Sequence, residues 1–259
     1  MKTARLTVVG AGPGDPDLIT LKAIKVLAAA DVVLYDALVN PILLTHAPTA
    51  EKIFVGKRMG CYAYQQEQIN ELIVSRALSH GHVVRLKGGD PFIFGRGSEE
   101  LDFVKEYNIE TAVVPGISSA LAVPAYLGIP LTKRGCSESF WVITGTTKRH
   151  TLSADVALAV QSNATIAILM GMSKLSEIVA AFAKAGKEKT PIAIIQNGTR
   201  EDQKSGIGTI ETIEAIVKEK QLSSPAIIVI GSVVRNRSTL SETISSIKEK
   251  SNHNVFNYA

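Results

Sequence analysis

Residues 83–99 read VVRLKGGDPFIFGRGSE, and the character of the chain changes halfway along this stretch. Its first part is rich in apolar and β-branched residues, which is typical of a buried strand. The strand breaks at Gly88 and Gly89, where the backbone can take a positive φ and approach a ligand closely. Pro91 keeps Asp90 out of the helical region, so the following loop stays extended. Because open α/β sheets bind ligands beyond the carboxyl ends of their strands, the stretch predicts a ligand-binding loop in an α/β protein.

The composition is that of an ordinary globular protein, with 46% hydrophobic and 20% charged residues among 259. This length allows one large domain or two of modest size. The net charge of +4 and the pI near 9.0 weakly favour an acidic partner. No block of Lys or Arg forms a basic arm, which disfavours nucleic acid.

The chain has two cysteines, Cys61 and Cys136, and lacks a Cys-x-x-Cys pair, which disfavours a zinc site or a disulfide framework. We therefore expect no metal and a reducing compartment. The N-terminus lacks a signal-peptide pattern, and no stretch approaches the roughly 20 apolar residues of a membrane span. These features predict a cytoplasmic protein without a membrane partner.

A second glycine-rich stretch, GAGPGDP at residues 10–16, follows an apolar strand predicted at 6–9. It resembles a dinucleotide fingerprint, but Asp15 stands where the third glycine belongs. A carboxylate there would repel a pyrophosphate, and Pro13 removes an amide that phosphate would need. The stretch therefore disfavours a nicotinamide dinucleotide and is compatible with a nucleoside that carries a sulfonium.

Asp36 ends the next predicted strand, at residues 31–36, after a helix predicted over 17–29 with Asp17 as its N-cap. It lies over the same sheet edge as the glycine-rich stretches. Three roles fit it equally by position: a ribose acceptor about 20 residues beyond the glycines, a cap for a helix near Asn40, or a functional carboxylate.

The remaining pattern alternates strands and helices, which argues for two α/β units. The linker falls at residues 128–134, with a domain at 1–130, a second at 131–245 and a polar tail at 246–259. In the first domain we also expect strands at 53–58 and 111–114, and helices at 67–78, 99–107 and from 115–120 onward. In the second domain we expect strands at 140–144, 164–170, 191–195 and 226–230, and helices near 174–184 and 210–219.

The run RLKGGDPFIFGRG, the GKR triplet at residues 56–58 and the first glycine-rich stretch occur together and in order. Over about residues 4–240 the chain resembles the tetrapyrrole (class III) S-adenosylmethionine methyltransferases. The resemblance implies two α/β domains with a cofactor cleft between them, assembled as a homodimer. It also implies S-adenosylmethionine as cofactor and S-adenosylhomocysteine as its product.

The resemblance further implies roles for individual residues. Asp36 matches the proton acceptor, with Lys57 as its partner. The expected cofactor contacts are Pro13, Gly88, Gly89, Asp90, Ile93, Ser118, Ser119, Met170 and Gly198. Ser119 departs from the usual Thr-Ala pair at that place. The expected contacts to substrate carboxylates are Arg58, Lys87, Arg96, Lys133 and Arg134.

The implied reaction is the transfer of two methyl groups to uroporphyrinogen III, at C2 and C7, giving precorrin-2 for sirohaem or cobalamin. The alternatives are a later precorrin methyltransferase of the same fold, a methyltransferase of ribosomal RNA or diphthine, and a tetrapyrrole-binding carrier without turnover.

Overall fold

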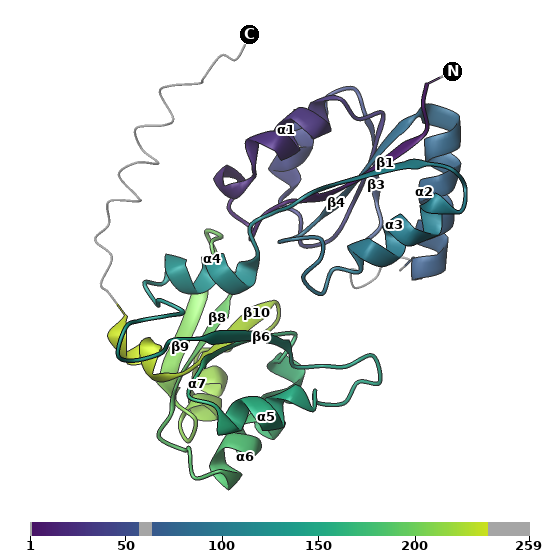
Figure 1. Cartoon of the computed structure of the whole chain (residues 1–259). Coiled ribbons are helices and arrows are strands. Elements are labelled where there is room, and N and C mark those ends of the chain that lie inside the picture. Colours follow the sequence, from purple (N-terminus) through teal and green to yellow (C-terminus); the bar gives the residue numbers. More distant parts are fainter. Residues whose placement is uncertain (1, 57–63, 238–259) are drawn as a thin grey trace, which may run out of the picture.

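The computed structural model describes residues 2–56 and 64–237, which form two five-stranded sheets (Figure 1). The strands of the first sheet are all parallel and lie in the order β3-β2-β4-β1-β5. They are β1 (Arg5–Gly10), β2 (Val32–Tyr35), β3 (Glu51–Phe54), β4 (His82–Lys87) and β5 (Glu110–Val114). Because the strands are parallel, all their carboxyl ends meet at one edge, and the central β4 delivers residues 88–96, the central loop, to that edge.

Helices cover both faces of the first sheet, as expected for a parallel sheet (Figure 1). One face packs against α1 (Leu21–Ala28) and the short helix η2 (Pro41–His46). The other face packs against α2 (Gln66–His80) and α3 (Gly97–Lys105). Strand residues are buried on both faces, which explains the nearly continuous apolar runs of the sequence.

The helix predicted over 17–29 is split in two, and its predicted N-cap is wrong. A short helix, η1 (Pro16–Leu18), is capped by Asp15, whose Oδ1 accepts from the amide of Asp17. The helix α1 begins later because Thr20 caps it, accepting from the amide of Ala23 at 3.2 Å. The two caps fix where the first glycine-rich stretch ends.

The second sheet is mixed, with the order β6-β7-β10-β8-β9 and only β6 and β7 parallel. Its strands are β6 (Phe140–Thr144), β7 (Thr165–Leu169), β8 (Pro191–Gln196), β9 (Lys204–Thr209) and β10 (Ala226–Ile230). One face packs on α5 (Asp155–Gln161), α6 (Leu175–Lys184) and α7 (Ile213–Glu219). The short helix η3 (Met172–Lys174) precedes α6.

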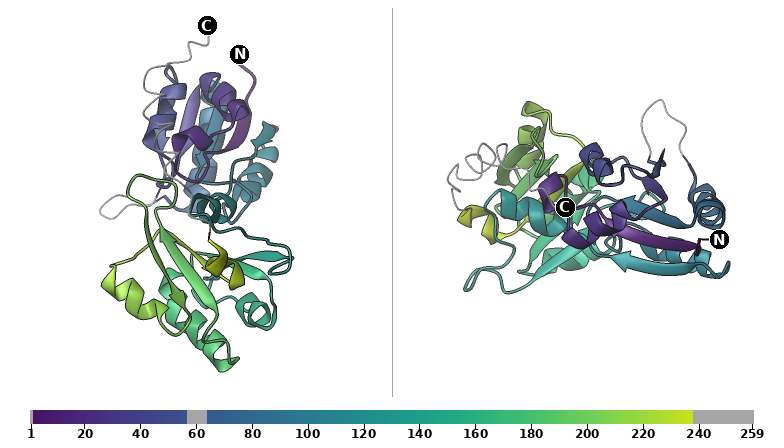
Figure 2. Two further views of the ribbon diagram at one scale, coloured as in Figure 1. Left: turned by 90° about the vertical axis from the view of Figure 1, so that its left-hand side faces the viewer. Right: turned by 90° about the horizontal axis from the view of Figure 1, so that it is seen from above.

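The other face of the second sheet packs on α4 (Ser119–Tyr126) and η4 (Ser232–Asn236). The sequence places α4 in the first domain, but its Val123 is buried among residues of β8 and β10. Figures 1 and 2 show α4 at the top of the second unit, facing the first. The division at residue 130 stays a prediction, and the chain passes from one sheet to the other between β5 and α4.

Among the described strands and α-helices, two escaped the sequence analysis. The edge strand β9 reads KSGIGT, in which two glycines hide the strand pattern, and α5 is only seven residues long. Among residues 2–56 and 64–237, no helix is long and apolar enough to span a membrane.

Candidate cofactor and substrate site

A cleft of about 680 Å³ lies where the carboxyl edge of the first sheet faces the second sheet. Its volume is in the range usual for small-molecule sites. The first sheet contributes residues that follow β1, β2, β3 and β4, and the second contributes residues that follow β7 and β8 and precede β10. The start of α4 also lines the cleft, so both units supply walls of one site.

Backbone contacts between glycines bring three loops together at the floor of the cleft. The amide of Gly89 donates to the carbonyl of Gly12 at 2.7 Å, and the amide of Gly12 donates back at 3.2 Å. A Cβ on Gly10 would lie 2.5 Å from Gly116 Cα, so a larger residue would force these loops apart. The glycines are therefore needed for close backbone packing as well as for access to a ligand.

Asp90 uses both carboxylate oxygens to hold loops. Its Oδ1 accepts from the amide of Phe92 at 2.9 Å, and its Oδ2 accepts from the amide of Gly116 at 3.0 Å. The central loop is thereby joined to the segment that leads into α4. The side chain of Asp90 positions the cleft wall through these bonds.

All nine residues expected to contact the cofactor line this cleft: Pro13, Gly88, Gly89, Asp90, Ile93, Ser118, Ser119, Met170 and Gly198. They follow β1, β4, β7 and β8 or stand at the start of α4, so only the fold brings them together. Ser118 is also the N-cap of α4, accepting from the amide of Ala120 at 3.2 Å.

The space beside Gly89 and Met170 suits an elongated ligand with an apolar part. A Cβ on Gly89, whose φ is +68°, would meet no atom closer than 3.8 Å, the amide nitrogen of Ser119. Met170 is 52% exposed, which is unusual for a methionine in a strand-end loop. An open cradle beside a helix amide and an exposed thioether fit an adenosine with an amino-acid arm.

The first glycine-rich stretch is tied to the second unit through Asp15. The phenol of Tyr126 donates to Asp15 Oδ2 at 2.5 Å, and the amide of Asp15 donates to Thr199 Oγ1 at 3.0 Å. Burial and this hydrogen bond raise the pKa of Tyr126 to about 12, so the phenol stays a donor at neutral pH. Asp15 is buried and does not line the cleft, so its carboxylate holds the loop to the second unit and does not contact a ligand directly.

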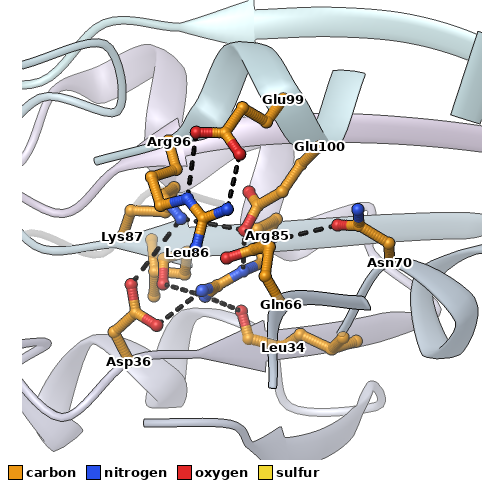
Figure 3. Close-up of polar contacts among 10 residues, drawn as sticks. All are labelled: Leu34, Asp36, Gln66, Asn70, Arg85, Leu86, Lys87, Arg96, Glu99 and Glu100. Carbon is orange, nitrogen blue, oxygen red and sulfur yellow. Dashed lines mark hydrogen bonds and ion pairs between the residues drawn. The ribbon is translucent and has the colours of Figure 1, made fainter. Parts of the chain in front are cut away.

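A network of charged side chains surrounds Asp36 (Figure 3), and three of its members, Asp36, Arg85 and Lys87, line the cleft. Arg85 Nη2 lies 2.5 Å from Asp36 Oδ1, and Lys87 Nζ lies 3.9 Å from Asp36 Oδ2. Both cations also contact Glu100 Oε1, at 3.1 Å from Arg85 Nε and 3.0 Å from Lys87 Nζ. Two cations and two carboxylates therefore balance within a nearly dry region.

The surroundings of the network set its protonation. Burial opposes the charge of Arg85, but the ion pairs with Glu100 and Asp36 outweigh burial and raise its pKa. Burial and the charge of Arg85 lower the pKa of Lys87, and the two carboxylates oppose that change.

Asp36 does not cap a helix, because the cap of η2 is Asn40, which accepts from the amide of Ile42.

Arg96 lies at the mouth of the cleft, half exposed, and pairs with Glu99 through Nε at 2.9 Å and Nη2 at 2.5 Å (Figure 3). Its hydrogen bond with Glu99 raises the pKa of Arg96 and lowers that of Glu99. Arg96 lines the cleft, in agreement with its expected position.

The other expected cations fall in different places. Lys87 lines the cleft but is only 4% exposed, because its ammonium turns inward to Glu100. Lys133 and Arg134 do not line the cleft, and Lys133 Nζ donates to Asn236 at 3.0 Å. Lys57 and Arg58 lie outside the described residues, so their roles stay predictions.

The sequence analysis missed Arg85 and Glu100, although one signal was available. Arg85 interrupts the apolar run of Val83, Val84 and Leu86. It stands two residues before Lys87, so both side chains point to the same face of the strand. Glu100 carried no signal, because a glutamate near a helix start is usually solvated. Among the described residues, no group of three or more His, Cys, Asp or Glu could hold a metal ion.

Residues 5–214 match the model of the Tetrapyrrole (Corrin/Porphyrin) Methylases, and the chain belongs to this family. The resemblance expected from the sequence is thereby confirmed. The uroporphyrinogen-III C-methyltransferase of Methanocaldococcus jannaschii is 45% identical over 235 residues, which cover 90% of this chain and 97% of that protein. The siroheme synthase of Nitrosomonas europaea is 42% identical over 235 residues. These residues cover 90% of this chain but only 50% of that longer protein.

Solved structures agree with the fold. The uroporphyrin-III C-methyl transferase of Thermus thermophilus, complexed with S-adenyl homocysteine, has a TM-score of 0.78 and 36% identity, covering 90% of this chain and 99% of that one. A cobalt precorrin-4 methyltransferase has a TM-score of 0.79 and 28% identity, covering 89% and 96%. The expected fold, two α/β units of the tetrapyrrole methylase type, is confirmed.

Proposed function

We propose that this chain is an S-adenosylmethionine-dependent methyltransferase that methylates uroporphyrinogen III to precorrin-2, an early step toward sirohaem and cobalamin. The observation that carries the proposal is the cleft, in which residues of both sheets that match the family's cofactor contacts line one site. Relatives that match this chain along nearly their whole length support the choice of substrate.

S-adenosylmethionine, when bound, supplies a methyl group on a sulfonium, which needs no metal for its transfer. The work of the chain is to place the two reactants and to exclude water. The interlocked loops around Gly12, Gly89 and Gly116 form a rigid floor for this purpose. Positioning of this kind can contribute roughly 7 to 11 kcal/mol at its best.

We assign the role of proton acceptor to Asp36. Its side chain is 29% exposed and lines the cleft, while Arg85 fixes the orientation of the carboxylate by holding Oδ1. Only Oδ2 is then available to accept a proton from a substrate. The assignment of Lys57 as its partner rests on the sequence motif.

The substrate class bears several carboxylates, and among the expected cations that the structure describes, Arg96 is the best placed to meet them. It is exposed at the mouth of the cleft, beside the apolar Ile93 and Phe94, which are 37% and 44% exposed. A flat, apolar macrocycle with anionic arms suits this combination. Lys87, which turns toward Glu100, contributes to the internal network instead of meeting the substrate directly.

The test is anaerobic incubation of the purified protein with uroporphyrinogen III and S-adenosylmethionine, followed by mass spectrometry. A product heavier by two methyl groups supports the proposal. If the substrate is unchanged while calorimetry shows S-adenosylhomocysteine binding, the proposal fails. A later precorrin intermediate would then be tried, because the structure of the cobalt precorrin-4 methyltransferase is equally similar.

Two further expectations from the sequence analysis remain proposals. Assembly as a homodimer would appear in sedimentation velocity as a species of about twice the monomer mass of 27.7 kDa. A location in the cytoplasm rests on the composition and would be checked by cell fractionation.

A further inference from the structure

Glu100 is fully buried in the first turn of α3, yet it carries a carboxylate. Its Oε1 accepts three hydrogen bonds, from Lys87 Nζ at 3.0 Å, Arg85 Nε at 3.1 Å and Gln66 Nε2 at 3.2 Å (Figure 3). Its Oε2 is buried and has no partner among the described residues. Burying a carboxylate costs free energy of desolvation, which only close ion pairs and hydrogen bonds can offset.

The two cations that Glu100 holds are the two that face Asp36 from β4. Lys87 Nζ lies between the two carboxylates, 3.0 Å from Glu100 and 3.9 Å from Asp36. At 3.9 Å the ammonium makes no hydrogen bond with Asp36 Oδ2. The position of Lys87 therefore decides whether Asp36 Oδ2 accepts a hydrogen bond from the ammonium or only lies in a long ion pair with it.

We infer that Glu100 is a positioning residue, which draws the Lys87 ammonium away from Asp36 and keeps Asp36 Oδ2 free to accept a proton. This inference rests on the proposed role of Asp36 in methyl transfer. Without the Glu100 charge, Lys87 would turn to the remaining anion and hold Oδ2. A carboxylate held by two cations is a weaker base.

The charges around Asp36 are few within the described chain. Arg85 and Lys87 face it from β4, and Glu100 stands behind them on α3. Gln66 of α2 is neutral and contacts only Glu100 and Asn70 among these groups. Removing the charge of Glu100 therefore leaves two cations opposite one carboxylate.

The first experiment compares Glu100→Gln with the wild type, because glutamine keeps the size and an acceptor oxygen. Carbon-13 NMR of the Asp36 carboxyl should show that more acid is needed to protonate it in the variant than in the wild type, because Lys87 then holds Oδ2. Single-turnover methyl transfer at neutral pH should fall about tenfold, and the acidic limb of the pH–rate profile should move to lower pH. Calorimetry should give an unchanged affinity for S-adenosylhomocysteine.

The second variant is Glu100→Gln with Lys87→Met, which removes both members of the pair and preserves the net charge of the network. A buried ion pair replaced as a whole usually leaves stability intact. The titration of Asp36 and the acidic limb should return toward those of the wild type. A role in stability alone would leave the acidic limb unmoved in both variants.

Identical Asp36 titrations in wild type and Glu100→Gln would overturn the inference. So would a double variant that titrates like the single one. The NMR titration needs no turnover, so it judges the positioning role even if the wild type fails to methylate uroporphyrinogen III. A failure of the wild type to form product would count against the proposed function alone.

Discussion

Tyr126 and Asp15 are joined by a hydrogen bond of 2.5 Å between a phenol on α4 and a carboxylate in the first glycine-rich stretch. The amide of Asp15 donates in turn to Thr199, next to Gly198 of the opposite wall. The bond thus ties Pro13 to the second unit, so Tyr126 bears on cofactor binding although it does not line the cleft.

Removing this bond should loosen the cofactor site. We expect Tyr126→Phe to weaken S-adenosylhomocysteine binding by about threefold to tenfold, the loss of one hydrogen bond. Calorimetry measures the affinity, and Tyr107→Phe, an exposed tyrosine after α3, is the matched control. Equal affinities for wild type and Tyr126→Phe would show that this hydrogen bond does not hold the cofactor site in its binding geometry.

The same phenol predicts a dependence of stability on pH. The pKa of Tyr126 is raised to about 12, above the ordinary tyrosine value of 10.0, so the folded state favours the protonated phenol. This contribution is complete below pH 10 and is lost as pH rises toward about 12. Urea unfolding at pH 9 to 12 should show a steeper decline for the wild type than for Tyr126→Phe. Parallel declines would contradict the assignment.

Substitution of Asp36 separates the two roles that remain for it, proton acceptor and ribose acceptor. As the proton acceptor, Asp36→Asn should slow methyl transfer by about two to four decades and leave S-adenosylhomocysteine binding intact. Single-turnover kinetics and calorimetry measure the two quantities, with Asp102→Asn, an exposed carboxylate on α3, as control. A loss confined to cofactor affinity would favour a ribose acceptor.

The backbone at Gly198 tolerates no side chain. A Cβ there would lie 2.3 Å from Val123 Cγ1, so Gly198→Ala must displace α4 or the strand-end loop. We expect weaker S-adenosylhomocysteine binding and an overpacking cost of about 1–3 kcal/mol. Adding Val123→Ala should recover part of the binding, because it removes the clashing methyl groups. No recovery would mean that the glycine is needed for another reason.

The cations separate into those near the cleft and those away from it. Arg96→Gln should raise KM for the tetrapyrrole more than it lowers kcat, by about fivefold or less, since an exposed pair contributes about 0–1 kcal/mol. Lys133→Ala should leave KM unchanged, because Lys133 bonds to Asn236. Steady-state kinetics tests both, and a larger effect for Lys133 would reverse this assignment.

Much of the fold could be predicted because parallel strands and their glycine turns leave plain signals. Strands at 140–144 and 226–230 coincide with β6 and β10. The site was harder, since its parts depend on contacts between distant segments. Asp15 was used only as an argument against a pyrophosphate, whereas the structure shows it buried and bonded to Tyr126 of α4. Glu100 could not be found, because its partners arrive from other elements.

Within residues 2–56 and 64–237 the chain passes from one sheet to the other once, and contacts such as that of Asp15 with Thr199 also join the two units. A ligand that touches both walls acts as an additional bond between the units. Thermodynamic linkage is reciprocal. If docking of the two units raises the affinity for the ligand by some factor, binding of the ligand raises the equilibrium constant for docking by the same factor. Bound S-adenosylhomocysteine should thus make the two units melt together, converting a broad calorimetric transition into a single sharper one.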